Sequence, residues 1–293
     1  MDAREAHMKW TPGGDSKNIE DRRGQSGGGG GFRGGGLRLG LGGTLVVLVL
    51  SVIFRQDLFR LLDPGAAVGG APSVGGPVGS TPQEDTLAQF VTFVLNDAQN
   101  MWTRELPRMG VDYRDATLVL FRDGTESACG YAETASGPFY CPGDQRVFID
   151  LGFYQELKDR FGAPGDFAQA YVLAHEIGHH VQWLLGTEEQ VRRAQRTRPS
   201  QENDLSVRME LQADCYAGVW AHAAERAQLL EVGDIDEGLN AAAAVGDDRL
   251  QRMSTGHVNP DTFTHGSSAE RVAWFRRGYT TGRSDACDTF SAR

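Results

Sequence analysis

The chain has 293 residues, of which 40% are hydrophobic and 23% charged, and its formal net charge is −10. This length suits one ordinary domain with appendages, and the hydrophobic content is sufficient for a folded core. The acidic balance is the opposite of the basic balance that nucleic-acid-binding proteins show, so we expect no nucleic-acid partner.

The beginning of the chain is rich in glycine. Twelve of the twenty residues from 24 to 43 are glycine. Such a stretch buries too little apolar surface to offset the entropy that is lost on ordering. We therefore predict that residues 1–36 form a disordered, Gly-rich arm.

An uncharged apolar run follows the arm. Residues 39–54 read LGLGGTLVVLVLSVIF, bracketed by Arg38 and Arg55. A membrane-spanning helix needs about 20 mainly apolar residues, and flanking arginines can extend a shorter run. A buried core helix would need folded neighbours, a cleaved signal peptide would end in small residues, and a buried strand would be shorter. The pattern favours one transmembrane helix over residues 37–55.

Basic residues around this run predict its orientation. Seven Lys or Arg residues precede it, whereas only Arg55 and Arg60 follow it before Arg104. By the positive-inside rule the amino terminus lies in the cytoplasm and the rest outside, as in a single-pass protein of the cell membrane. Residues 56–83 are rich in Pro and Gly and are interpreted as a linker, which leaves residues 84–293 as an extracytoplasmic domain.

All four cysteines lie in this domain, namely Cys129, Cys141, Cys215 and Cys287. Four cysteines allow three pairings, and pairing Cys129 with Cys141 would close a short loop and leave Cys215 for Cys287. An oxidising compartment permits both bonds. A zinc site of four cysteines is disfavoured because the sequence lacks a C-x-x-C pair, and four free thiols stay an alternative.

The domain is expected to be α+β, rich in helices, with a small sheet. Residues 116–121 and 146–150 are rich in apolar and β-branched residues and predict strands. Asp166 is a candidate N-cap, and Gly186 follows the end of the same predicted helix. Helical periodicity predicts helices over residues 84–106, 153–162, 165–186, 200–228, 236–253 and 267–279.

The predicted helix over residues 165–186 contains HEIGH, from His175 to His179, which matches H-E-x-x-H. Residues four apart share a helical face, so both imidazoles can bind one zinc ion. Glu176 projects about 100° from His175 and can accept a proton from a water molecule at the metal without being a ligand. His180 points away from this pair and is interpreted as a polar neighbour or a surface residue.

A third ligand is expected on the next long helix, in the segment RMELQADCYAG. Glu210 and Asp214 lie four residues apart on one face. Glu210 can bind the metal, while Asp214 can accept a hydrogen bond from a ligand imidazole and fix its tautomer. The alternative is that both are solvated helix charges, which their apolar neighbours disfavour.

Several segments together resemble the bacterial family of membrane-anchored, putative neutral zinc metallopeptidases. They are MKW and NIEDRRG near the start, SACGYAETASGPFYCPGDQRVFID, AHEIGHHVQ, ELQADCYAG and FTHGSSAERVAWF. The E-x-x-x-D arrangement is similar to that of gluzincin peptidases. The resemblance implies a zincin-like domain with His175, His179 and Glu210 as zinc ligands, Glu176 as general base and Asp214 behind the ligands.

The same resemblance implies a role for PDTFTHGSSAERVAWF. A distant histidine in gluzincins often stabilises the oxyanion, which makes His265 a catalytic candidate with Asp261 as its orienting partner. The alternative is that His265 packs against or caps the following helix, whose N-cap is Ser267 or Ser268.

The expected function is hydrolysis of peptide bonds in a peptide or protein substrate, with Zn²⁺ as cofactor. Two alternatives stay open. One is an inactive binding module that zinc stabilises, and the other is a zinc hydrolase that acts on a non-peptide amide such as cell-wall material. The sequence determines neither the substrate nor the oligomeric state.

Overall fold

The computed structural model describes residues 7–12, 16–25, 80–133 and 137–291. The predicted transmembrane helix at residues 37–55 lies outside these ranges, as does the linker up to residue 79. Among the helices that are described, none is both long and apolar enough to cross a membrane.

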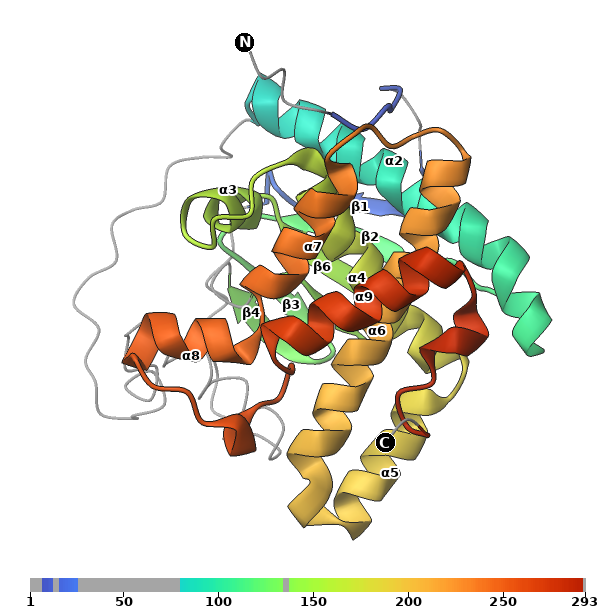
Figure 1. Ribbon diagram of the computed structural model, residues 1–293. Helices are drawn as coiled ribbons and strands as arrows, with labels where there is room; N and C mark the ends of the chain where they lie inside the picture. Colours follow the sequence, from blue (N-terminus) through green and yellow to red (C-terminus); the bar gives the residue numbers. More distant parts are fainter. Residues whose placement is uncertain (1–6, 13–15, 26–79, 134–136, 292–293) are drawn as a thin grey trace, which may run out of the picture.

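A four-stranded sheet forms one layer of the domain (Figure 1). Its order is β1 (Ile19–Asp21), β2 (Thr117–Phe121), β6 (Arg146–Asp150) and β5 (Phe139–Cys141); β1, β2 and β6 are parallel and β5 is antiparallel to β6. The central strands β2 and β6 are the two predicted from sequence, and almost every residue in them is buried, as in other parallel sheets. A separate hairpin consists of β3 (Gly124–Ser127) and β4 (Gly130–Glu133).

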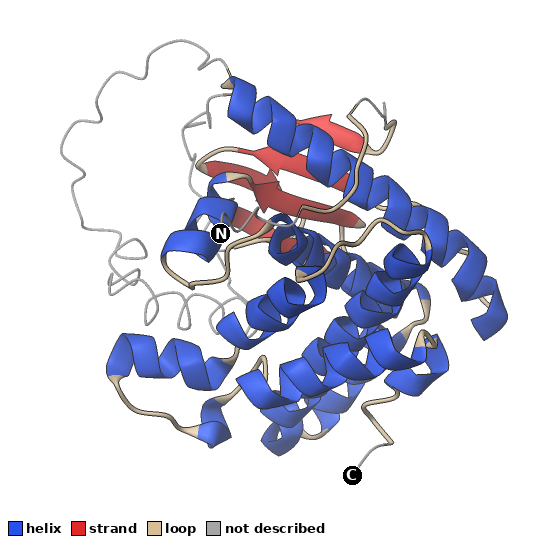
Figure 2. Ribbon diagram, turned by 45° about the horizontal axis from the view of Figure 1, so that its top comes forward, coloured by secondary structure: helices blue, strands red, loops and turns tan. Residues whose placement is uncertain are grey.

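The two faces of the sheet have different neighbours because successive side chains in a strand point to opposite faces. Leu118 and Leu120 of β2 belong to the main core with the helices, whereas Val119 and Phe121 belong to a small cluster with Cys141 and Phe148. Figure 2 shows the strands gathered on one side of the molecule and most of the helices on the other. The domain is therefore α+β, as predicted.

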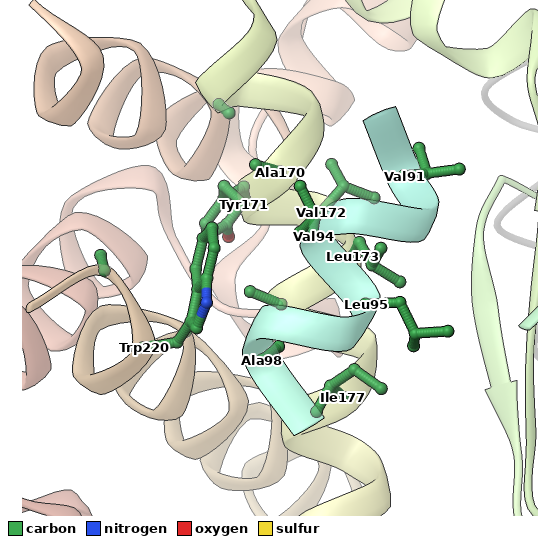
Figure 3. Close-up of a cluster of buried hydrophobic side chains, with 14 of the residues drawn as sticks. Val91, Val94, Leu95, Ala98, Ala170, Tyr171, Val172, Leu173, Ile177 and Trp220 are labelled. Carbon is green, nitrogen blue, oxygen red and sulfur yellow. The ribbon is translucent and has the colours of Figure 1, made fainter. Parts of the chain in front are cut away.

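Eight α-helices are described, and two of them, α2 and α4, form the centre of the core. They are α2 (Pro82–Glu105), α3 (Gly152–Asp159), α4 (Asp166–Leu184), α5 (Thr187–Thr197), α6 (Glu202–Arg226), α7 (Asp234–Ala244), α8 (Asp247–Thr255) and α9 (Ser268–Thr281). Apolar residues at helical spacing on α2 and α4 face each other, and Trp220 of α6 packs beside them (Figure 3). Short 3-10 helices are η2 (Leu106–Met109), η4 (Pro199–Gln201), η5 (Pro260–Thr262) and η6 (Ser284–Cys287).

Helices α6 and α9 touch through their backbones at two glycines. A side chain on Gly218 would collide with the carbonyl oxygen of Phe275, and one on Gly278 would collide with the carbonyl oxygen of Cys215. This contact fixes α9 against α6. The N-cap of α9 is Ser267, one of the two predicted, and it forms a capping box with Glu270.

Both disulfides have the pairing favoured by the sequence. Cys129 bonds Cys141, and Cys215 bonds Cys287, which lie 12 and 72 residues apart. No described cysteine is free. The second bond ties η6 to α6 and is buried in the main core.

Some predicted helices differ from the observed ones. The single helix predicted over residues 236–253 is two helices, α7 and α8, because the chain turns at Val245 and Gly246, where a side chain on Gly246 would collide with Ser268. The N-cap of α4 is Gly165 with φ 114°, and Asp166 is the first helical residue. Helix α5 and strands β3 to β5 were not predicted; α5 is polar and buries only Val191.

The amino-terminal residues also differ from the predicted disordered arm. Residues 7–12 and 16–25 pack on the domain: Met8 is 3% exposed, Trp10 packs edge-on against Phe90, and β1 pairs with β2. Arg23 forms an ion pair with Asp85 of α2 at 3.2 Å. These contacts join residues far apart in the sequence, which is why local glycine content did not reveal them.

The two disulfides should stabilise the domain unequally. On a chain-entropy basis a 72-residue separation predicts about 4 kcal/mol and a 12-residue separation about 3 kcal/mol. Replacing Cys215 and Cys287 together by Ala should therefore lower the free energy of unfolding more than replacing Cys129 and Cys141. Chemical denaturation of both double variants checks this order, and equal losses would contradict it.

Candidate metal centre

Helix α4 carries the HEIGH motif in its buried part. His175 and Glu176 are 6% and 7% exposed, and the side chain of His179 is 18% exposed. The two imidazoles lie on one face, with ring centroids 4.8 Å apart. The predicted spacing therefore brings these two histidines together.

Helix α6 approaches α4 closely at this face. A Cβ on Gly178 would lie 3.0 Å from the carbonyl oxygen of Ala213, so the missing side chain at this position permits the approach. Glu210 and Asp214 lie on the α6 face that meets α4, and they contact the α4 imidazoles. The structure thus brings together all four residues predicted to hold or orient the metal.

The ligand groups of three residues lie at the spacing that a zinc ion requires. His175 Nε2 is 3.2 Å from His179 Nε2 and 3.2 Å from Glu210 Oε2, and His179 Nε2 is 3.5 Å from Glu210 Oε1. Zinc in tetrahedral coordination, with bonds of about 2.0–2.2 Å, separates its ligand atoms by about 3.4 Å. The three residues therefore fit zinc, and they also form a group able to hold a metal ion.

The tautomer of His175 is fixed by Asp214, which contacts the ring nitrogen that does not face the other ligands. Its Nδ1 lies 2.9 Å from Oδ1 of Asp214, which is completely buried. A carboxylate only accepts hydrogen bonds, so Nδ1 carries the proton and Nε2 presents a lone pair to the site. This is the role predicted for Asp214.

The tautomer of His179 is fixed by two glutamines that the sequence analysis did not identify. Gln212 Nε2 donates to the carbonyl oxygen of Cys287 at 3.0 Å, and Gln182 Nε2 donates to the carbonyl oxygen of Met209 at 2.7 Å and to Gln212 Oε1 at 3.1 Å. Main-chain carbonyls only accept, so Gln182 Oε1 must face His179 Nδ1, at 2.8 Å, as an acceptor. His179 Nδ1 therefore carries the proton, and its Nε2 is also a lone-pair donor.

In these tautomers, two imidazole lone pairs and one carboxylate converge on one place. Burial lowers the pKa of His175, but Asp214 and Glu210 outweigh burial and raise this pKa to about 10. Burial raises the pKa of Glu210, but His179 and His175 outweigh it and hold this pKa well below its usual range. The carboxylates thus favour a positive charge at this place: without a metal it is a proton on His175, and a divalent metal would replace that proton.

Arg271 of α9 lies behind the ligands and was not singled out from sequence. It is 3% exposed and binds Asp214 with Nε at 2.8 Å and Nη2 at 2.9 Å. Tyr171, four residues before His175, also donates to Asp214 through its hydroxyl group. Burial raises the pKa of Asp214, but Arg271 and His175 keep it below the ordinary value, so Asp214 stays charged.

A signal for Arg271 was present in the sequence. Phe275 and Gly278 follow it by four and seven residues, and all three are the buried positions of α9. An arginine at a core position of a periodic helix indicates a buried acidic partner, because an unpaired buried charge is costly.

Glu176 is not a member of the group that could hold the metal. It is almost fully buried, and burial raises the pKa of its carboxyl group against the opposing influence of His179 and His175. A carboxylate with a raised pKa accepts a proton from water more readily.

His265 lies near the ligands, but its acidic partner is Asp247 and not Asp261. His265 Nδ1 is 3.2 Å from Asp247 Oδ1, while Asp247 Oδ2 accepts the main-chain N–H groups of Thr264, His265 and Gly266. Asp261 lies exposed in η5. Burial lowers the pKa of His265, but Asp247 and Glu210 outweigh it, so the pKa is raised.

Asp261 was predicted as the partner of His265 because it lies only four residues away in the sequence, and this prediction is wrong. The observed partner begins α8 and reaches His265 only because the chain breaks at Gly246. The side chain of His265 is 39% exposed.

His180 is not part of the centre, although its surroundings differ from the expected surface. It is fully buried, with Nδ1 at 2.9 Å from the Tyr140 hydroxyl and Nε2 at 2.6 Å from the carbonyl oxygen of Arg114. Burial lowers its pKa to about 4, so the ring is neutral. Cys215 is also excluded as a zinc ligand, since it is bonded to Cys287.

Comparison with protein families identifies the chain's relatives. The model of the family "Putative neutral zinc metallopeptidase" matches residues 8–290. The chain belongs to this family. It is 47% identical over 290 residues to the uncharacterized protein YpfJ of Escherichia coli strain K12, covering 97% of this chain and 99% of that protein. It is 45% identical over 208 residues to the uncharacterized protein Mb2605 of Mycobacterium bovis, covering 67% of this chain and 68% of that protein. No solved structure matches the chain.

Membership of this family implies zinc as the cofactor, and the donor set agrees with it. Two imidazoles and a carboxylate are the ligands of many catalytic zinc sites, which keep a fourth position for water or substrate. The resemblance found in the sequence is thereby confirmed for the family.

Replacing Arg271 by Leu should destabilise the domain strongly. The change leaves Asp214 buried without its cation, which typically costs about 3–5 kcal/mol. It should also weaken zinc binding, because Asp214 orients His175. Chemical denaturation and zinc titration measure both effects.

The matched control is Arg276→Leu, which alters an exposed arginine on the same helix. It should change the free energy of unfolding by less than about 0.5 kcal/mol. Equal losses in the two variants would show that the buried pair does not contribute as described.

Proposed function

We propose that the chain is a zinc-dependent peptidase in which Glu176 is the general base. The observation that carries this proposal is the convergence of His175, His179 and Glu210 at the spacing of metal ligands, together with the buried Glu176, which is not in that group. Zinc held by His175, His179 and Glu210 would polarise the scissile carbonyl and lower the pKa of a water molecule.

The residues of the chain then have defined tasks. Glu176 takes a proton from the attacking water and later delivers it to the leaving amine. His265, which Asp247 orients, donates a hydrogen bond to the oxyanion that develops on the substrate carbonyl. Asp214 and Gln182 keep both ligand imidazoles in the tautomer that binds metal.

The number of protein ligands supports a catalytic rather than a purely structural zinc. Among the described residues the metal group has three members, whereas structural zinc sites are usually closed by four protein ligands. His179 and Glu210 keep 18% and 19% of their side chains exposed, so the proposed site is open to a substrate. The two disulfides support a location of the domain in an oxidising compartment.

Replacing Glu176 by Gln should abolish peptide hydrolysis while zinc stays bound. Gln keeps the size of the side chain but cannot accept a proton, so kcat/KM should fall about 10²-fold or more. A quenched mixed-peptide library measures cleavage, and elemental analysis measures zinc on the same samples. The control is Glu189→Gln, which changes an exposed glutamate on α5.

Three results would decide against the peptidase. Unchanged cleavage by Glu176→Gln would remove the assigned base. Zinc binding without cleavage of any peptide would favour a structural zinc, and cleavage of a cell-wall amide alone would favour the non-peptide hydrolase.

The carboxylate partner of His265 gives a separate prediction. His265→Ala should lower kcat about 10²-fold to 10³-fold, because one donor to the oxyanion is lost, while zinc content is unchanged. Asp247→Asn should lower kcat in the same direction, whereas Asp261→Asn should leave it unchanged, since Asp261 is exposed. Steady-state kinetics compares the three variants, and a loss in Asp261→Asn alone would refute the assignment of Asp247.

A further inference from the structure

Three carboxylates converge at a second place, at the amino ends of α4 and α7. Asp166 is the first residue of α4, and Asp234 and Glu237 are the first and fourth residues of α7. One oxygen of each lies within 4.8 Å of the others. Asp166 precedes His175 by nine residues, which is about 13 Å along α4, so this cluster is distinct from the zinc ligands.

Two of the three carboxylates, Asp166 and Asp234, have a hydrogen-bond partner on only one of their oxygens. Each of the three accepts one main-chain N–H from a different segment: Asp166 from Met8 at 2.8 Å, Asp234 from Glu231 at 2.8 Å, and Glu237 from Phe167 at 3.1 Å. The other oxygens of Asp166 and Asp234, both named Oδ1, are buried and have no hydrogen-bond partner within the part of the chain that the structure describes.

The unpartnered oxygen of Asp234 is a second observation at this place. Asp234 is 0% exposed, and a buried carboxylate oxygen without a partner is costly. Gly165 has no side chain, and any Cβ there would collide with the carboxylate of Glu237. The backbone is thus shaped to hold the third carboxylate against the start of α4.

The charge at this place matches a divalent ion. The amino end of a helix supplies about half a positive charge, so the ends of α4 and α7 together offset about one of the three negative charges. The nearby imidazole of His7, 3.6 Å from Asp166, is mostly exposed to solvent. Burial, the largest influence, and the charges of Asp166 and Asp234 raise the pKa of Glu237 to about 7. Without a cation the cluster would therefore take up a proton near neutral pH, whereas a divalent cation would keep it ionised.

The chemical type of the three donor groups indicates which cation the cluster would bind. All three donors are carboxylates, which suit hard cations, whereas zinc prefers sites with His or Cys. Calcium accepts irregular geometry and carboxylates of either denticity, whereas magnesium demands near-octahedral geometry and retains water. We propose that Asp166, Asp234 and Glu237 form a calcium site.

This site would join three parts of the chain. Asp166 belongs to the helix that carries the zinc ligands, Asp234 and Glu237 belong to α7, and the main chain of Met8 is bound to Asp166. Bound calcium would therefore hold the amino-terminal segment and α7 against the start of α4. It would act on stability and would leave the zinc ligands unchanged.

The test uses the purified, zinc-loaded full chain in calcium-free buffer at pH 7.5. Isothermal titration with calcium chloride should show one calcium per chain. At a calcium concentration about 100 times Kd, Tm should rise by about 5 °C or more.

Glu237→Gln provides the decisive variant, because Gln can still accept the N–H of Phe167 but carries no charge. It should bind calcium about tenfold more weakly or worse, and in calcium-free buffer its Tm should exceed that of the wild type, since one of three adjacent negative charges has been removed. Asp236→Asn, an exposed position on α7, and His7→Gln, whose imidazole lies 3.6 Å from Asp166, should both keep the calcium response.

Two results would overturn the proposal. One is a wild-type chain that shows neither calcium heat nor a calcium-dependent Tm. The other is a Glu237→Gln chain that binds calcium as tightly as the wild type.

Discussion

The rest of the centre depends on the hydrogen bonds and the ion pair that the buried carboxylate of Asp214 forms. It lies on α6 and accepts hydrogen bonds from His175 and Tyr171 of α4 and from Arg271 of α9. A fully buried carboxylate is unfavourable unless a cation and several donors surround it, so these three helices must come together around it. The same constraint directs the lone pair of His175 toward the metal position.

The orientation of the second ligand imidazole, that of His179, is determined by main-chain carbonyl groups rather than by a charged side chain. The orientation of His179 follows from Gln182 and Gln212, and that relay ends at the carbonyl oxygen of Cys287. The disulfide between Cys215 and Cys287 holds this carbonyl beside α6. A covalent bond at the end of the chain therefore contributes to the geometry of a ligand on α4.

The features predicted correctly from the sequence are those that depend on residues close together in the chain. The spacing of His175 and His179 and of Glu210 and Asp214 identified the centre, because positions four apart on a helix must share a face. Apolar runs identified β2 and β6. The pairing of β1 with β2, the break between α7 and α8, and the partnership of His265 with Asp247 were not predictable in this way, because each rests on contacts between distant segments.

Arg271 and Gln182 illustrate an intermediate case. Both lie at buried positions of helices whose periodicity was recognised, and a polar side chain at such a position implies a buried partner. The pattern could reveal that a partner exists, but only the packing of α4, α6 and α9 shows which residue it is.

The parallel pairing of β1 with β2 has a topological consequence. Both strands belong to one sheet, so Gln25 and Ser80 must lie on the same side of any lipid bilayer. A chain that crosses a bilayer once between these two residues cannot form this sheet, because β1 and β2 would be on opposite sides. The sheet therefore requires β1 and the part of the domain that carries both disulfides to lie in one compartment.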